Sequence, residues 1–387
     1  MYCWIMLIWV LIIWQVIQPK QTKLKKSLDG IPDIIATKKY CILLFIVPVV
    51  IISLRTEFGD TGSYIRKFNE MLTDWNDFST VVKEDTKAQL FVGFEFLFKT
   101  FISKNAQIFL AFLALMQSWL MLRTFKKYSP DIGMSVFMFV ASALIISWMG
   151  NGVRQGIAVM ICFACTELLL KKKYVPYYAV LLLTMGLTPL ANRFGLEAPV
   201  WFLGGIHQSV LIMILASFCI IGKPFNIKVW LAGVALVVLI FTNGLDDILE
   251  DAVENTTYVN DLIYAQQDTG TSLIRVAVAM VPMILALLAM KEIKKPTTPP
   301  VIALAANASV ITSILYIASA FTSGIYVGRL PVYTEMYNLI LVPWLVRHAY
   351  NKEQQILTIA FIGFYTVYFF YQVSIQWKGL FQIGILS

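Results

Sequence analysis

Residues 301–322 read VIALAANASVITSILYIASAFT, a stretch without a single charged side chain. Its length matches the roughly 20 residues that an α-helix needs to cross the hydrocarbon core of a bilayer. Eleven more apolar segments can be marked along the chain: 2–17, 40–54, 105–122, 132–148, 153–170, 174–190, 206–221, 228–243, 272–290, 330–346 and 355–372. We therefore predict an all-α integral membrane protein with about 12 transmembrane helices.

The composition supports this interpretation. Of 387 residues, 58% are hydrophobic and only 14% are charged, which excludes an ordinary soluble domain. Lysines follow the short first segment instead of preceding it, so we expect an uncleaved span with its N-terminus outside. An even number of spans then places the C-terminus outside as well. We expect residues 1–387 to form one polytopic membrane domain, with no nucleic acid as a partner.

The basic residues divide unequally between the two sides of this topology. If every segment crosses once, one set of alternate loops holds 17 of the 23 lysines. The positive-inside rule assigns that set to the cytoplasm. The other set holds six of the eight arginines, namely Arg55, Arg66, Arg154, Arg193, Arg275 and Arg329.

Topology does not explain the arginines on the outer side. Each one, taken alone, could anchor a helix end at the interface. Lysine would serve that purpose equally well, yet it is scarce at these helix ends. A guanidinium differs from an ammonium because its planar fork matches phosphate oxygens in a bidentate way. We therefore expect the outer arginines to bind pyrophosphate, and Arg154 and Arg275 also lie in first helical turns, which attract anions.

Two outer loops are long. Residues 55–104 contain two amphipathic stretches, 64–78 and 90–102, which we predict to be helices lying in the membrane interface. Residues 244–271 carry seven acidic side chains and no lysine or arginine. That acidic loop is either a solvated cap or a lid that contacts sugars or cations.

Candidates for a general base are few. His207, followed by Gln208, begins an apolar segment on the outer side, and its imidazole could accept a proton from a sugar hydroxyl. A purely structural histidine is the alternative. Asp60 is the second candidate for the base, or for a metal ligand, and its alternative role is to cap a helix. No paired metal-ligand spacing, nucleophile elbow or phosphate-binding loop occurs, so we expect no cofactor and leave a divalent metal open.

Five stretches resemble EpsG-type, Wzy-like polysaccharide polymerases of bacterial envelopes. In order along the chain they begin at Gly59, Trp148, His207, Ser272 and Thr322, and they read GDTGSY, WMGNGVRQGIAV, HQS, SLIR and TSGIYVGRLPVY. The similarity extends from about residue 50 to 345. The Asn-Gly-x-Arg-Gln and Gly-Arg-Leu-Pro-x-Tyr stretches are the most specific parts.

The resemblance implies a GT-C-like glycosyltransferase in the bacterial cytoplasmic membrane with its active site on the outer face. Its substrates would be undecaprenyl-pyrophosphate-linked oligosaccharide repeats, and a chain-length regulator is a further expected partner. His207 or Asp60 would deprotonate the acceptor, and Arg154 and Arg329 would stabilise the leaving pyrophosphate. The substrate-binding residues would be Arg55, Tyr64, Asn151, Gln155, Gln208, Arg275 and Tyr333. We expect the arginines to surround one shared pocket.

Three other functions fit parts of the pattern. A flippase for lipid-linked oligosaccharides would place its polar residues near the membrane midplane, whereas here they gather on one face. An O-antigen-ligase-like transferase would share the donor and use a different acceptor. An acyltransferase that decorates envelope sugars would need a donor site on the cytoplasmic side.

Overall fold

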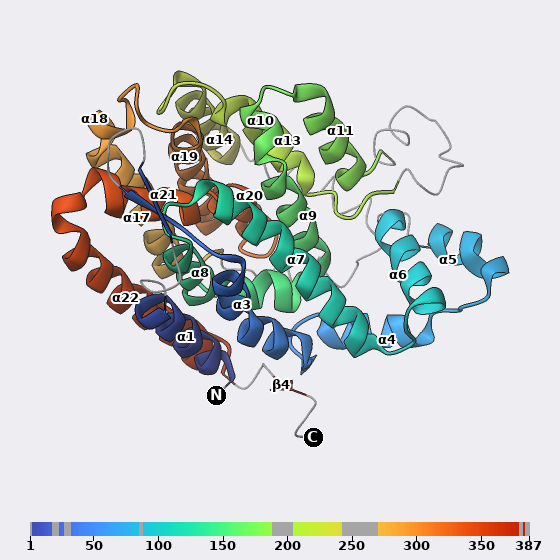
Figure 1. The fold of residues 1–387 in the computed structure, drawn as a ribbon. Coiled ribbons are helices and arrows are strands. Elements are labelled where there is room, and N and C mark those ends of the chain that lie inside the picture. Colours follow the sequence, from blue (N-terminus) through green and yellow to red (C-terminus); the bar gives the residue numbers. More distant parts are fainter. Residues whose placement is uncertain are drawn as a thin grey trace. The chain divides into compact units, whose positions relative to one another are not determined.

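The computed structural model describes residues 2–17, 23–26, 32–84, 88–187, 204–241, 270–378 and 382–383. Helices dominate these residues (Figure 1). The strands among them form two short antiparallel pairs, β1 (Lys23–Lys26) with β2 (Pro32–Ile35) and β3 (Arg55–Glu57) with β4 (Gln382–Ile383). The prediction of an all-α protein is confirmed. Arg193 and the acidic loop up to residue 269 lie outside the described residues.

The helices form two compact units. Unit 1 comprises residues 1–211 and 352–387, and unit 2 comprises residues 212–351. The helix α13 (Val210–Ile220) begins at the end of the first range and continues into unit 2. The prediction of a single membrane domain stays a prediction.

Unit 1 is built from helices at both ends of the chain. They are α1 (Tyr2–Ile12) with the π-helix η1 (Ile13–Ile17), α3 (Lys38–Ser53), α4 (Thr61–Glu70), the 3-10 turn η2 (Trp75–Asp77), α5 (Phe78–Glu84), α6 (Gln89–Phe101), α7 (Ala106–Tyr128), α8 (Ile132–Ala141), the π-helix η3 (Ile145–Asn151), α9 (Val153–Ala164), α10 (Thr166–Leu170), α11 (Tyr174–Met185), α22 (Gln354–Phe370) and the π-helix η8 (Tyr371–Gln376). The 3-10 turn η7 (Asn351–Glu353) leads into α22.

Unit 2 contains the rest of the described helices. They are α14 (Ile227–Phe241), α17 (Leu273–Leu288), α18 (Met290–Ile293), α19 (Pro300–Phe321), the 3-10 turn η5 (Val327–Arg329), α20 (Val332–Glu335), α21 (Asn338–Trp344) and the π-helix η6 (Leu345–Ala349). The long helix α19 is central to unit 2, because α14, α17, α20 and α21 all pack against it.

The apolar helices identify a membrane-embedded protein. Within the described residues, four helices are long and apolar enough to cross a membrane: Ala106–Tyr128, Val153–Leu170, Pro300–Phe321 and Asn351–Gln376. A bent pair, α8 with η3, would be a fifth, and five apolar helices are shorter. Each of the predicted segments contains a helix, but the number of twelve crossings stays a prediction.

Two predicted segments are not the continuous helices that their hydropathy suggested. In 132–148 the chain bends by 71° between α8 and η3. Ala143 causes the break, because its φ of 60° is left-handed and cannot continue an α-helix. In 330–346 the helix is divided into α20, α21 and η6, and Pro343 lies inside the middle piece.

The helix starts follow the side chains that precede them. Asn105 begins α7 by accepting hydrogen bonds from the N–H groups of Gln107 and Ile108, at 2.8 and 3.3 Å. Asp131 accepts from the Met134 N–H at the start of α8, at 3.1 Å. Such caps satisfy backbone donors that have no partner within the helix.

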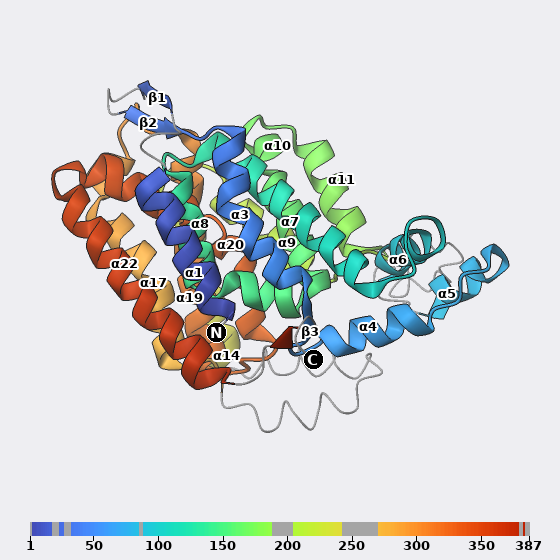
Figure 2. The same ribbon diagram turned by 60° about the horizontal axis from the view of Figure 1, so that its bottom comes forward.

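In unit 1, α7 packs between α3 and α9, as Figure 2 shows. The first and last helices lie side by side, and the Trp4 and Phe369 rings meet edge to face at 5.2 Å. This arrangement places the C-terminal end of α3, the start of α4 and the start of α9 close together, which is where the first group of candidate residues lies.

Residues 55–104, predicted to form an outer loop, differ in part from the predicted pair of amphipathic helices. The second stretch matches α6. The first, 64–78, ends early, because α4 stops at Glu70. Lys99 donates from its Nζ to the carbonyl oxygens of Asn69, at 2.9 Å, and Met71, at 2.5 Å, and so terminates the helix. Its interfacial location stays a prediction.

Candidate functional sites

Arg55 lies just beyond the end of α3 and is 1% exposed. Its Nε donates to the Thr61 Oγ1 at 3.1 Å, and its Nη1 donates to the Ile52 carbonyl oxygen. Burial lowers the pKa of Arg55 to about 10, while Tyr64 opposes that shift. Since the guanidinium is buried and two of its N–H groups donate to protein oxygens, the geometry favours a positioning role for Arg55 over direct contact with phosphate.

Thr61 connects this arginine to the second motif. Its Oγ1 donates to the Gly150 carbonyl oxygen at 2.9 Å, directly before η3 ends. One residue earlier, the Asp60 N–H donates to the Asn151 Oδ1 at 2.8 Å. The stretches that begin at Gly59 and at Trp148 are therefore held together by two hydrogen bonds.

Gly59 is necessary at this junction for two reasons. Its φ of 50° lies in the left-handed region, which side chains with a Cβ adopt at a cost. A Cβ placed on Gly59 would also overlap the side-chain amide of Asn151. The close approach of these two residues explains why a glycine precedes Asp60.

Arg154 and Tyr64 form the centre of the unit 1 cluster. Arg154 donates hydrogen bonds to the Tyr64 oxygen from its side chain and its backbone. Burial raises the pKa of the Tyr64 hydroxyl, and the positive charge and hydrogen bonds of Arg154 oppose the increase. Both side chains are partly buried. A guanidinium held in this way presents a fixed positive charge at the first turn of α9.

Asp60 lies beside this pair, and its negative charge also acts on Tyr64. The residue precedes α4 at the N-cap position, but its carboxylate makes no capping hydrogen bond. The side chain is exposed. The alternative role predicted from the sequence, a helix cap, is therefore not observed for the Asp60 side chain.

His207 has a specific hydrogen-bonding arrangement. Its Nδ1 accepts from the Ser209 N–H at 3.2 Å and lies 2.6 Å from the Ser209 Oγ. A nitrogen that accepts from an N–H carries no hydrogen, so in the neutral ring the hydrogen is on Nε2. In this state His207 offers a donor at Nε2, and its single lone pair on Nδ1 is engaged. Gln208 is exposed.

One aromatic cluster connects all three stretches of unit 1. Its buried members are Phe68, Ala88, Phe91, Phe98, Ala106, Phe109, Leu113, Val153 and Ile157. Tyr64 and Ile206 pack against it from the side. The cluster thus includes Val153, which precedes Arg154, and it contacts Tyr64 and Ile206, which precedes His207. Gln155, the next residue after Arg154, is buried.

Unit 2 contains a second cluster around Arg275, near the start of α17. Ser272 caps this helix by accepting from the Arg275 N–H at 3.4 Å. The guanidinium lies over the Tyr316 ring, 5.2 Å from its centroid, and Nη2 donates to the Tyr316 hydroxyl at 3.3 Å. That hydroxyl donates in turn to the Glu335 Oε2 at 2.7 Å. A cation, a phenol and a carboxylate therefore form one chain.

The two motif stretches of unit 2 also approach each other closely. A Cβ on Gly328 would lie 2.6 Å from the Thr271 Oγ1. Thr271 is fixed to α19 because its hydroxyl accepts from the Ser319 Oγ at 2.8 Å and its N–H donates to the Ser319 carbonyl at 2.9 Å. Arg329, next to Gly328, is exposed, and Tyr333 is 2% exposed.

Tyr316 and Glu335 are participants that the sequence interpretation missed. Glu335 was recognisable, because it is a carboxylate within the apolar segment 330–346, and such residues are costly unless they have a partner. Tyr316 gave no signal of its own within the apolar segment 301–322. Only the packing of α17 against α19 brings its hydroxyl between Arg275 and Glu335.

Comparison with known proteins agrees with the geometry. The model of the EpsG family matches residues 38–382, which include both clusters. No curated protein and no solved structure matches the chain. The matched region covers most of the 387 residues and all five stretches that resemble the family. On this basis the chain is a member of the EpsG family.

Proposed function

We propose that this protein is a glycosyltransferase that polymerises undecaprenyl-pyrophosphate-linked oligosaccharide repeats on the outer face of the bacterial cytoplasmic membrane. Membership of the EpsG family supports a polysaccharide polymerase in general. The observation that carries the finer proposal is the fixed Arg154–Tyr64 pair beside the exposed Asp60. It combines an anion-binding group and a proton acceptor in one place.

In this proposal each cluster binds one pyrophosphate, that of the donor lipid or that of the acceptor lipid. The base must lie near the anomeric carbon that is attacked, and the donor's pyrophosphate is bonded to that same carbon. The cluster that contains the base is therefore the donor cluster, with Arg154 on the leaving pyrophosphate. Arg275, with the exposed Arg329, binds the pyrophosphate of the acceptor, and Asn151 and Gln208 orient phosphate or sugar hydroxyls. The buried Gln155 and Tyr333 are, like Arg55, positioning residues.

The reaction breaks the bond between the anomeric carbon and the pyrophosphate oxygen. A hydroxyl of the incoming repeat forms the new glycosidic bond and gives its proton to a carboxylate. Asp60 suits this role better than His207, because the lone pair of the neutral His207 ring is engaged by Ser209. His207 then acts as a donor to phosphate or sugar. Arginine stabilises the charge that develops on the departing diphosphate.

The topology completes the proposal. About twelve crossings in a GT-C-like arrangement place both termini and both clusters outside the cytoplasm, and the lysine-rich loops inside. The arginines of the two clusters are the outer ones that the positive-inside rule leaves unexplained.

A strain that lacks this protein tests the proposal. Complementation with the wild-type chain restores a ladder of polymer lengths, and Arg154→Lys should restore a much weaker ladder, because it polymerises more slowly. Arg66→Lys is the matched control, because Arg66 is an exposed arginine on α4 outside the cluster. Equal ladders from Arg154→Lys and Arg66→Lys would refute the bidentate role of Arg154.

A further inference from the structure

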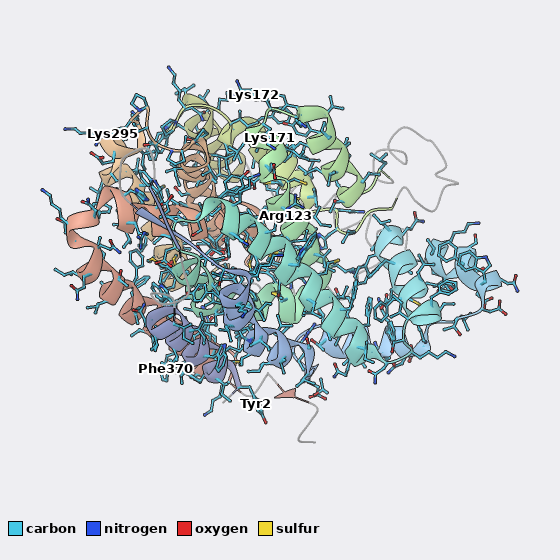
Figure 3. The ribbon with its side chains drawn as sticks, viewed as in Figure 1. Tyr2, Arg123, Lys171, Lys172, Lys295 and Phe370 are labelled. Carbon is cyan, nitrogen blue, oxygen red and sulfur yellow. The ribbon has the colours of Figure 1, made fainter. Side chains whose placement is uncertain are left out.

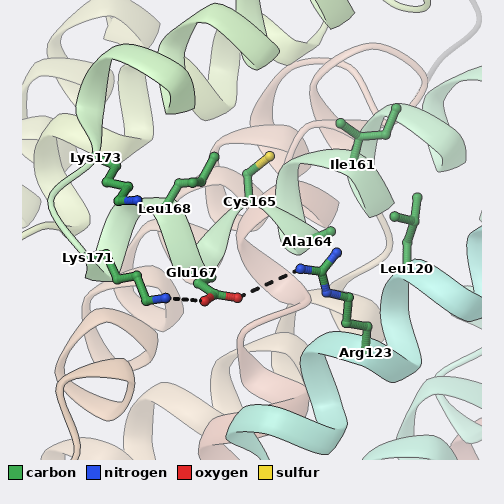
Figure 4. A pocket seen from close by; sticks show the side chains of 9 residues that line it. All are labelled: Leu120, Arg123, Ile161, Ala164, Cys165, Glu167, Leu168, Lys171 and Lys173. Atoms are coloured by element: carbon green, nitrogen blue, oxygen red, sulfur yellow. Dashed lines mark ion pairs between the residues drawn. The ribbon is translucent and has the colours of Figure 1, made fainter.

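A pocket outside the motif stretches is lined by residues of α7, α9 and α10 in unit 1. Its volume is about 410 Å³, which lies within the range of about 300–1,000 Å³ typical of small-molecule sites. One wall is apolar, formed by Leu120, Ile161, Ala164 and Leu168, with Cys165 among them. The other residues that line it are Arg123, Glu167, Lys171 and Lys173 (Figure 4).

The charged side of the pocket has an excess of cations. Glu167 is paired with the Nζ atoms of Lys127 and Lys171, both at 2.6 Å, and lies 3.9 Å from the Arg123 Nη2. In the part of the chain that the structure describes, no carboxylate lies within ion-pair distance of Lys173. Three cations therefore share the single carboxylate of Glu167, Lys173 has no such partner among the described residues, and the positive charge is only partly neutralised.

A turn in the left-handed region helps to bring these lysines to the pocket. After α10 the N–H groups of Lys172 and Lys173 donate to the carbonyls of Leu169 and Leu168, at 3.0 and 2.8 Å. This is the Schellman termination, in which the residue with positive φ is usually glycine. Here it is Lys172, with φ of 56°. The turn lets Lys171 and Lys173 both line the pocket, while Lys172 is exposed (Figure 3).

Topology and helix dipoles account for only part of this arrangement. The positive-inside rule requires cations in the short loops, and helix C-termini favour them too. Neither effect requires an apolar wall beside the cations. The combination of an apolar wall with a cationic rim matches a molecule that has an acyl chain and a phosphate.

We propose that this pocket binds the phosphate head group of an anionic lipid, such as phosphatidylglycerol, from the cytoplasmic leaflet. Arg123 and Lys173 bind the phosphate oxygens, and the upper part of an acyl chain lies against Leu120, Ala164 and Leu168. Basic pockets between membrane helices on that side commonly hold such head groups. None of the residues that line the pocket belongs to the motif stretches, and the proposal does not depend on the proposed reaction.

Native mass spectrometry of the full chain, purified in detergent with phosphatidylglycerol or phosphatidylcholine, tests the site. The variant Arg123→Gln with Lys173→Gln removes two cations and keeps the 2.6 Å ion pairs of Glu167. We expect it to retain about 25-fold less phosphatidylglycerol, since each of the two basic residues near anionic lipid contributes about fivefold. Retention of phosphatidylcholine should not change.

Two further variants and a competition experiment distinguish lipid binding in the pocket from two alternatives. These are a general attraction between the basic protein and anionic lipid, and binding of free phosphate without a lipid. Lys291→Gln with Lys294→Gln removes the same charge from exposed lysines outside the pocket and should leave retention unchanged. Ala164→Phe fills the apolar wall without a change of charge and should also lose the lipid. If the two charge variants behave alike, or if inorganic phosphate displaces the lipid as well as phosphatidylglycerol does, the proposal is wrong.

Discussion

Arg154 donates hydrogen bonds to the hydroxyl oxygen of Tyr64 from both its side chain and its backbone. The two residues belong to stretches that are distant in sequence, and α4 and α9 bring them together around one aromatic cluster. The pair fixes a permanent positive charge at the start of a helix, next to the exposed Asp60. The proposed chemistry of unit 1 depends on this relationship.

The hydroxyl of Tyr64 is the simplest part of the pair to remove. Tyr64→Phe keeps the ring against Phe91, where the centroids are 6.3 Å apart, and deletes the acceptor of Arg154. Hydrogen bonds to charged groups contribute about 1.5–3 kcal/mol. We expect polymerisation to fall about tenfold with an unchanged amount of protein in the membrane, measured as polymer formed per molecule. Activity at the wild-type level would show that the pair does not orient the guanidinium.

The glycines of the first motif differ in what surrounds them. Gly59→Ala introduces a Cβ that overlaps Asn151 at a left-handed φ, so we expect the apparent melting temperature to fall and activity to be lost. Gly62→Ala is the control, because nothing lies within 4 Å of its Cβ. Alanine in a helix is about 1 kcal/mol more favourable than glycine. Gly62→Ala should therefore be neutral or slightly stabilising, and equal losses in both variants would contradict the proposed contact with Asn151.

The two candidate bases can be distinguished by variants that keep their shape. Asp60→Asn preserves the N–H that bonds to Asn151 and removes the proton acceptor. A general base contributes about 10²–10⁴-fold to a rate, so we expect a loss in that range. His207→Asn retains an acceptor for Ser209 and should lower the rate far less. A severe loss from His207→Asn together with an active Asp60→Asn would reverse the assignment.

Because Arg275, Tyr316 and Glu335 form one hydrogen-bonded chain, we expect substitutions at these residues to have non-additive effects on the free energy of unfolding. Glu335→Gln removes the negative charge that partly neutralises Arg275. Removing one partner of a buried ion pair can lower the free energy of unfolding by about 3–5 kcal/mol. Because Glu335 is only partly buried, we expect less, about 2 kcal/mol. Tyr316→Phe should lose a similar amount, and the double variant less than the sum. Glu292→Gln, which breaks a surface pair between a partly exposed Glu292 and the exposed Lys295, is the control and should change little.

Much of this fold could be predicted from the sequence because apolar runs and caps act locally. The predicted 90–102 helix matches α6, and Ser272 caps α17 three residues before Arg275. The predicted helix boundaries that were wrong depend on features that the local sequence does not show, such as a contact from a distant residue or an unusual backbone conformation. Lys99 ends α4 from another helix. Ala143 adopts a left-handed conformation that its residue type does not indicate.

The residues of the candidate sites also divide into features that the local sequence predicts and features that depend on distant contacts. Placing Arg154 and Arg275 in first helical turns required only the sequence, and the structure has both there. The burial of Arg55 could not be read from the sequence, because it results from Thr61 and the end of α3. Whether the arginines of both units surround one pocket stays a prediction.

A reconstituted reaction tests the central claim most directly. Protein in vesicles is given a defined undecaprenyl-pyrophosphate-linked repeat, and the lengths of the lipid-linked products are measured for the wild type, Arg154→Lys and Arg275→Lys. We expect a ladder from the wild type, a slower maximal rate from Arg154→Lys, and a higher KM for the repeat from Arg275→Lys. No product longer than one repeat from the wild type, or wild-type kinetics from both variants, would contradict the assignment of these arginines to the two diphosphates.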